Sequence, residues 1–129
     1  MKEKIRRFKT GATRSDDTGR IDPEAALSPL VLNEYCEHIK AHRLQPDWSI
    51  RADDNWQKGF SFESCAKGLN RHHLHFWLRH RGFPVKDAKA EPNIKRDLCA
   101  IIFNAQVYLH QLLKAEIEAE RKKKNVADR

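Results

Sequence analysis

The sequence has few cysteines and no long apolar run, and each shortage excludes a class of protein. Its 129 residues contain three cysteines, Cys36, Cys65 and Cys99, with no paired spacing. This argues against a disulfide framework and for a reducing cytosol, and we expect each thiol to be a small buried side chain. No run of 18 apolar residues is present, so we expect no membrane span. The basic start of the chain lacks an apolar segment, so we expect no secretory signal.

Several catalytic signatures are also missing. The sequence contains no GxSxG, HExxH or CxxC motif and no Walker spacing of glycines. No segment shows a convincing alternation of apolar and polar residues, which would indicate a strand. Helical periodicity covers residues 28–43, 62–81 and 94–122, with a start signal at Ser61 and a stop signal at Gly82. We therefore predict an all-α fold, a small bundle of three main helices with a loop-rich N-terminal arm.

The predicted organisation has three parts. Residues 1–27 form a basic N-terminal arm, residues 28–115 a helical core domain, and residues 116–129 a charged helix extension or tail. The last helix is apolar over more than one stripe, which suggests contacts on two sides, and a homodimer is one way to supply the second. The formal charge of +7 favours a polyanionic partner, whether nucleic acid, nucleotide or an acidic protein, and we expect no membrane partner.

The stretch RHHLHFWLRHRG, residues 71–82, holds four of the chain's seven histidines. On a helix, Phe76 and Trp77 group on one side, which we expect to face the core. His72, His75 and Arg79 group on another side. We expect this polar side to be a surface for an anion, because arginine binds phosphate oxygens bidentately.

Histidine spacing also permits a metal site. His72 and His75 are three residues apart, and His38 and His42 are four apart, so on a helix each pair points two imidazoles the same way. Two such pairs on facing helices would offer the nitrogen ligands that zinc favours. The plainer interpretation is a set of solvated or hydrogen-bonded imidazoles.

Two further clusters have a composition suited to phosphate. FKTGATR, residues 8–14, combines a glycine and two threonines with flanking basic residues, which suits a backbone nest. DDNWQKG, residues 53–59, offers two carboxylates for Mg²⁺ and a lysine for a phosphate, although an Asx turn before a helix has the same composition. Trp56, Trp77 and Tyr108 are the candidates for stacking on a base.

Five segments occur in an order that resembles a known family. They are RFKTGATR, ALSPLVLNEYCEHIKAHR, DDNWQKG, the RH…W…HRG helix and LCAIIFNAQVYLHQLLK, and they span about residues 6–114. Together they are similar to a small phage domain described as the N-terminal domain of dATP/dGTP diphosphohydrolases. The resemblance implies a phage or prophage protein in the cytoplasm of a bacterial host. It also implies hydrolysis of purine deoxynucleoside triphosphates with a divalent metal.

Two departures from the family pattern remove carboxylates. His75 stands where the resemblance implies an aspartate, and Gln111 where it implies a glutamate. Two functions therefore stay open. The first is phosphoanhydride hydrolysis of dATP or dGTP with Mg²⁺, Mn²⁺, Co²⁺ or Zn²⁺. The alternative is a non-catalytic basic phage accessory module, such as a counter-defence factor, that binds a nucleotide, nucleic acid or a host defence protein.

The candidate site residues combine these patterns with the resemblance. Asp53 and Asp54 are the predicted catalytic carboxylates, and His42, His72 and His75 are the predicted metal ligands. The predicted nucleotide- and phosphate-binding residues are Lys9, Thr10, Gly11, Thr13, Arg14, Asn55, Trp56, Lys58, Arg71, His80, Arg81 and Asn104.

Overall fold

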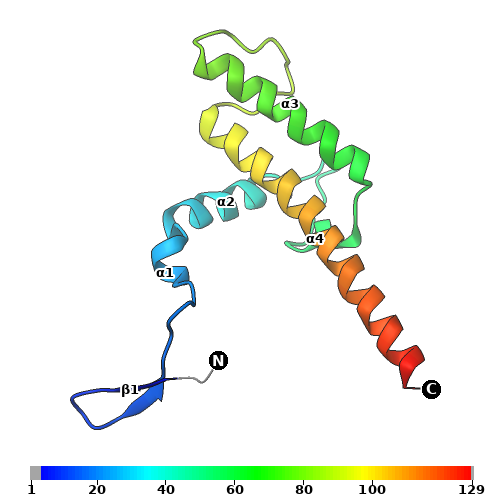
Figure 1. Ribbon diagram of the computed structural model, residues 1–129. Coiled ribbons are helices and arrows are strands. Elements are labelled where there is room, and N and C mark those ends of the chain that lie inside the picture. Colours follow the sequence, from blue (N-terminus) through cyan, green and yellow to red (C-terminus); the bar gives the residue numbers. More distant parts are fainter. Residues whose placement is uncertain (1–3, 129) are drawn as a thin grey trace. The chain divides into compact units, whose positions relative to one another are not determined.

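The computed structural model describes residues 4–128 and divides the chain into two compact units (Figure 1). The first unit ends at Leu30 and the second begins at Val31. The first three residues of the predicted N-terminal arm lie outside the described part. Helices α3 (Phe62–His80) and α4 (Ile94–Ala127) both belong to the second unit.

The prediction of a purely all-α fold is wrong in the first unit, which contains a two-stranded hairpin. Strand β1 (Ile5–Arg7) pairs antiparallel with β2 (Thr13–Ser15). Gly11 in the connecting loop has a φ of 90°, a conformation that glycine adopts without steric cost. Each strand has only three residues, too few to show the alternation by which a strand is recognised in a sequence. A short helix, α1 (Pro23–Ala26), follows the hairpin.

The three predicted main helices are confirmed. They are α2 (Pro29–Ala41), α3 (Phe62–His80) and α4 (Ile94–Ala127). At the start of α4, the side chain of Asn93 accepts a hydrogen bond from the backbone N–H of Arg96, which satisfies a first-turn donor. Among residues 4–128, no helix is both long enough and apolar enough to cross a bilayer.

Local signals fix both ends of α3. Ser61 begins it by accepting a hydrogen bond from a backbone N–H of the first turn. Gly82 ends it with a φ of 77°, and its N–H donates to the carbonyl oxygen of Arg79 at 3.0 Å. The N–H of Phe83 donates to the carbonyl oxygen of Leu78 at 2.8 Å, which completes a Schellman motif.

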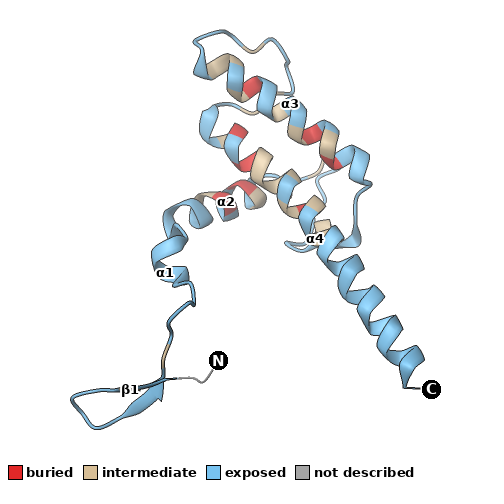
Figure 2. Ribbon diagram, viewed as in Figure 1, coloured by how far each residue is buried: buried red, intermediate tan, exposed pale blue. Residues whose placement is uncertain are grey.

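Helices α3 and α4 pack against each other and carry most of the buried residues of the second unit (Figure 2). They run antiparallel, because Gly68 lies against Asn104 and Arg79 bonds to Asp97. Buried and half-buried residues recur every three or four positions on both helices, as expected for two packed helices. On α3 they include Cys65, Gly68, His72, His75 and Arg79, and on α4 they include Asp97, Ala100, Asn104, Val107 and Gln111.

The predicted orientation of α3 is wrong. His75 is buried, with 6% of its surface exposed, whereas Trp77 is 49% exposed. Of the expected core side, Phe76 is half-buried, whereas Trp77 faces outward and has the guanidinium of Arg81 stacked on it at 5.4 Å. The polar side turns inward because α4 presents a partner for it: the fully buried carboxylate of Asp97 bonds to Arg79 at 2.7 Å.

The C-terminal part of α4 has no neighbour within the described chain. All residues from Leu112 to Asp128 are exposed, and they include Leu113 and Ile117 (Figure 2). The second apolar stripe of the helix therefore faces solvent. A homodimer stays a prediction.

The cysteines are only partly as expected. All three thiols are free, and Cys65 and Cys99 are buried, but Cys36 is exposed on α2. Burial raises the pKa of the Cys65 and Cys99 thiols, which makes them poor nucleophiles at neutral pH.

Candidate functional site

A pocket of about 270 Å³ opens in the second unit. It lies between the end of α2, the loop from α2 to α3 and the facing surfaces of α3 and α4. That loop contains a one-turn 3₁₀ helix, η1 (Asn55–Lys58). The lining combines imidazoles, guanidinium groups, carboxylates, amides and aromatic rings: His38, His42, His72, Arg43, Arg51, Arg71, Asp53, Glu91, Asn55, Asn104, Trp56, Phe60 and Phe103. Its volume lies near the lower end of the range for small-molecule sites.

Contacts with α4 position the aromatic part of the lining. The ring of Trp56 meets His110 edge-on, with 4.8 Å between the ring centroids. The ring of Phe60 lies 6.3 Å from that of Phe103, and the Phe60 N–H donates to the side-chain oxygen of Gln111 at 2.8 Å. The loop before α3 is thus tied to α4, and its rings form a fixed apolar surface in the pocket.

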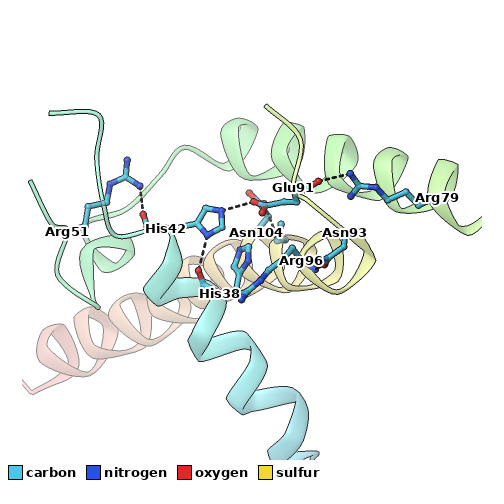
Figure 3. Close-up of polar contacts among 9 residues, drawn as sticks. His38, His42, Arg51, Arg79, Glu91, Asn93, Arg96 and Asn104 are labelled. Carbon is cyan, nitrogen blue, oxygen red and sulfur yellow. Dashed lines mark hydrogen bonds and ion pairs between the residues drawn. The ribbon is translucent and has the colours of Figure 1, made fainter. Parts of the chain in front are cut away.

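His38, His42 and Glu91 form a group whose potential ligand atoms all lie within 4.8 Å of one another. Nε2 of His42 lies 2.7 Å from Oε1 of Glu91, and Nδ1 of His42 lies 2.8 Å from the carbonyl oxygen of His38 (Figure 3). Both oxygens can only accept, so Nδ1 must donate, and Nε2 must share a proton or a metal ion with Glu91. A ligating histidine commonly donates its other N–H to a backbone carbonyl in this way.

His38 is the buried member of this group, with 4% of its surface exposed. Burial, followed by the nearby His42, Arg96 and His72, lowers the pKa of its imidazole to about 4. His38 is therefore neutral at pH 7, the form in which an imidazole binds a metal ion. Its Nδ1 has no hydrogen-bond partner among residues 4–128.

The pocket arginines differ in how far their charge is balanced. Arg43 pairs with Asp53 at 3.2 Å and donates Nε–H to the carbonyl oxygen of Arg51 at 2.7 Å. Arg51 donates to the carbonyl oxygen of His42 at 3.4 Å (Figure 3). Within the described part of the chain, neither Arg51 nor Arg71 pairs with a carboxylate. Two guanidinium groups are thus available to an anionic ligand.

The structure brings together part of the predicted site. The predicted residues that line the pocket are His42, Asp53, Asn55, Trp56, Arg71, His72 and Asn104. Those of the second unit that lie outside its lining are Asp54, Lys58, His75, His80 and Arg81. The predicted metal ligands also separate, because His75 belongs with His72 and Asp97 to a second group of possible ligands and His42 does not.

The remaining predicted phosphate ligands belong to the first unit, in the β1–β2 loop or in β2: Lys9, Thr10, Gly11, Thr13 and Arg14. All five are exposed. The N–H of Gly11 is used inside the loop, where it donates to the carbonyl oxygen of Phe8 at 2.9 Å. A phosphate at this loop would therefore depend on the side chains of Lys9, Thr10 and Arg14.

Several pocket residues had little or no sequence signal. His38 was visible only as the partner of His42 at helical spacing. Glu91 was not visible at all, because it lies in a loop 49 residues from His42. Arg43 and Arg51 flank a short hairpin turn, bridged between Leu44 and Ile50, that the sequence did not suggest. None of the family models, curated proteins or solved structures compared with this chain matches it.

Proposed function

We propose that this pocket binds a purine deoxynucleoside triphosphate with a divalent metal ion and hydrolyses its phosphoanhydride bond. The observation that carries the proposal is the composition of one small cavity. It combines a His–His–Glu group, arginines without carboxylate partners and three aromatic rings. This is the set of groups that a metal-bound, phosphorylated, aromatic ligand requires.

The ligand set favours a transition metal. Two imidazoles and one carboxylate, His38, His42 and Glu91, are the donors of many three-ligand zinc sites that leave a position open. Mg²⁺ prefers oxygen ligands throughout, so Zn²⁺, Co²⁺ or Mn²⁺ suits this group better. A bound ion would supply Lewis-acid polarisation of a phosphoryl oxygen.

The rest of the pocket accounts for the two ends of a nucleotide. Arg71 and Arg51 offer planar donors to phosphate oxygens. Trp56, Phe60 and Phe103 offer a surface for a base, and the amide of Asn104 lies beside them. The volume of about 270 Å³ suits a single small ligand rather than a polymer. The resemblance to a phage dATP/dGTP diphosphohydrolase domain agrees with this ligand.

A second function is favoured by the state of the carboxylates. Glu91 is engaged by His42 at 2.7 Å and Asp53 by Arg43 at 3.2 Å, so each pocket carboxylate already has a basic partner. Without a free carboxylate to activate water, the same pocket would sequester a nucleotide without turnover. This is the accessory-module alternative, whose ligand is a nucleotide or another anion.

The deciding experiment is incubation of the full chain with dATP or dGTP and each of Mg²⁺, Mn²⁺, Co²⁺ and Zn²⁺, read by chromatography. We expect a deoxynucleoside monophosphate and pyrophosphate with a transition metal. Nucleotide bound at equilibrium but unchanged would favour sequestration. If a folded sample shows no turnover and no binding of either nucleotide, both nucleotide functions are overturned.

Matched variants test the residues. Arg71→Ala should weaken nucleotide binding about 10-fold or more, because it removes a charge-assisted phosphate contact. Arg81→Ala, outside the pocket lining, is its control. Asp53→Ala should change activity more than Asp54→Ala, since only Asp53 lines the pocket. For nucleic acid as the ligand, affinity would instead fall steeply with salt, because each phosphate contact releases counterions.

A further inference from the structure

We infer that His72, His75 and Asp97 form a second metal site, buried between α3 and α4, which takes a transition metal of the zinc class and has a structural role. This inference goes beyond the proposed function and does not depend on it. One potential ligand atom from each of the three residues lies within 4.8 Å of the other two. His75 is 6% exposed and Asp97 fully buried, so an ion here would be almost enclosed.

The first argument is the hydrogen bonding of the ligand atoms. Nδ1 of His72, Nδ1 of His75 and Oδ1 of Asp97 are all buried and have no partner among residues 4–128. Buried polar atoms are nearly always satisfied, so three without partners in one cluster indicate that something binds between them. A metal ion satisfies all three at once, because each atom has a lone pair to donate.

The second argument is that the opposite sides of two of these ligands are held by other residues. Arg79 donates to Oδ2 of Asp97 at 2.7 Å. It also donates to the carbonyl oxygen of Glu91 at 2.6 Å (Figure 3). Oδ2 of Asp87 lies 3.8 Å from Nε2 of His75. This distance is too long for a hydrogen bond, but the carboxylate favours a proton on Nε2, which would leave the lone pair on Nδ1. Metal ligands are commonly oriented by outer partners of this kind.

The third argument is the chemistry of the donors. Two nitrogens and one carboxylate oxygen suit Zn²⁺ or Co²⁺ and not Mg²⁺. Bond lengths of about 2.0–2.2 Å place tetrahedral ligands roughly 3.4 Å apart. Small side-chain rotations therefore bring atoms within 4.8 Å into coordination.

The position of the cluster indicates what such an ion would do. It would join the second half of α3 to the first turn of α4, across the loop that contains Glu91. His72 belongs to the cluster and also lines the pocket. An ion bound here would fix the orientation of His72 without contacting a ligand in the pocket.

The test uses metal content and stability, not activity. The full chain is stripped with a chelator, loaded with Zn²⁺, freed of excess metal and analysed for zinc per chain. We expect zinc to raise the melting temperature. We expect His75→Gln and Asp97→Asn each to lose one equivalent of bound zinc and most of that rise. His73→Gln, an exposed histidine of α3 that belongs to neither group, should keep the zinc content and the rise in melting temperature of the wild type.

A second measurement needs no variant. Zinc should shift the assigned ring ¹⁵N resonances of His72 and His75 of the wild-type chain, even if the variants fold poorly. Wild-type zinc content in both His75→Gln and Asp97→Asn would overturn the inference. So would a zinc-loaded wild-type chain in which the rings of His72 and His75 show no coordination. A failure of nucleotide turnover would leave these results unchanged, so the two proposals fail separately.

Discussion

The two histidine groups of the second unit use the same kinds of residue in opposite surroundings. In the pocket group, His42 is 47% exposed at its side chain and already paired with Glu91. In the buried group, His75 and Asp97 are enclosed, and three potential ligand atoms have no partner among the described residues. On our proposals the pocket group would hold an exchangeable ion and the buried group a structural one. The two groups would then differ in how far they are open to solvent, and not in the types of residue that form them.

The largest effect on stability should come from the buried group. Arg79→Met leaves the fully buried carboxylate of Asp97 without its cation, and we expect the free energy of unfolding to fall by about 3–5 kcal/mol. Urea unfolding in the presence of a chelator measures this. Lys67→Met removes the exposed Lys67–Glu63 pair on the same helix and should cost about 0.5 kcal/mol or less. Equal losses for the two variants would contradict the contrast between buried and exposed charges.

The pH dependence of stability should report on His38. Its pKa is about 4 in the folded chain against an ordinary value of 6.5, so between these values only the unfolded state takes up the proton. Stability is therefore fully present above about pH 6.5 and falls as the pH drops toward 4, by up to about 3 kcal/mol for this group. Urea unfolding at pH 7 and pH 5 measures the loss, and the lowered pKa of His72 acts in the same direction.

A variant that cannot titrate separates the contribution of His38. His38→Gln should make the stability less dependent on pH between 7 and 5 than in the wild type. An unchanged slope would mean that another group, such as His72, carries the dependence.

A smaller effect tests the contact that brings the two helices together. A Cβ at Gly68 would lie 2.5 Å from Oδ1 of Asn104, so Gly68→Ala must push the amide aside. We expect a net loss of about 1–2 kcal/mol, because overpacking exceeds the gain in helix propensity. Asn104→Ala removes the clash, so the double variant should recover most of the loss. If the double variant instead loses the sum of the two single losses, the contact between Gly68 and Asn104 does not limit how closely the helices pack.

The smallest effect on stability is expected in the pocket group. Glu91→Gln keeps a polar partner for Nε2 of His42, and the carbonyl oxygen of residue 91 still binds Arg79. We expect a change of about 0.5 kcal/mol or less in the free energy of unfolding. Nucleotide affinity in the presence of Zn²⁺ should nevertheless fall, because a metal ligand is lost. If Glu91→Gln keeps the wild-type nucleotide affinity in the presence of Zn²⁺, Glu91 is not a metal ligand of this site.

The positions of the helices could be predicted from the sequence because the helix ends carry local signals. Ser61 and Gly82 bound α3 through their own backbone geometry, which needs no knowledge of the rest of the fold. The inward face of α3 could not be predicted in the same way. Amphipathic reasoning places Phe76 and Trp77 inside, and it fails for Trp77 because the facing helix presents a buried carboxylate to the polar side of α3.

The site was predictable only where its residues form local patterns. His72 and Arg71 stood out within a histidine-rich helix, and Asp53 and Trp56 within a polar loop. Glu91 had no such context, because its contact with His42 is made through the fold. Asp97, in the first turn of α4, looks in the sequence like an ordinary acidic residue near a helix start.

The buried ion pair of Arg79 on α3 with Asp97 on α4 also determines how the two helices are aligned along each other. Apolar side chains on two packed helices tolerate several registers, because one methyl group replaces another at little cost. A slide of one turn, about 5.4 Å, would carry Asp97 away from Arg79 and leave a carboxylate buried without a cation. We therefore expect α3 and α4 to have one favoured register. That register also sets the distances between the pocket residues that the two helices contribute.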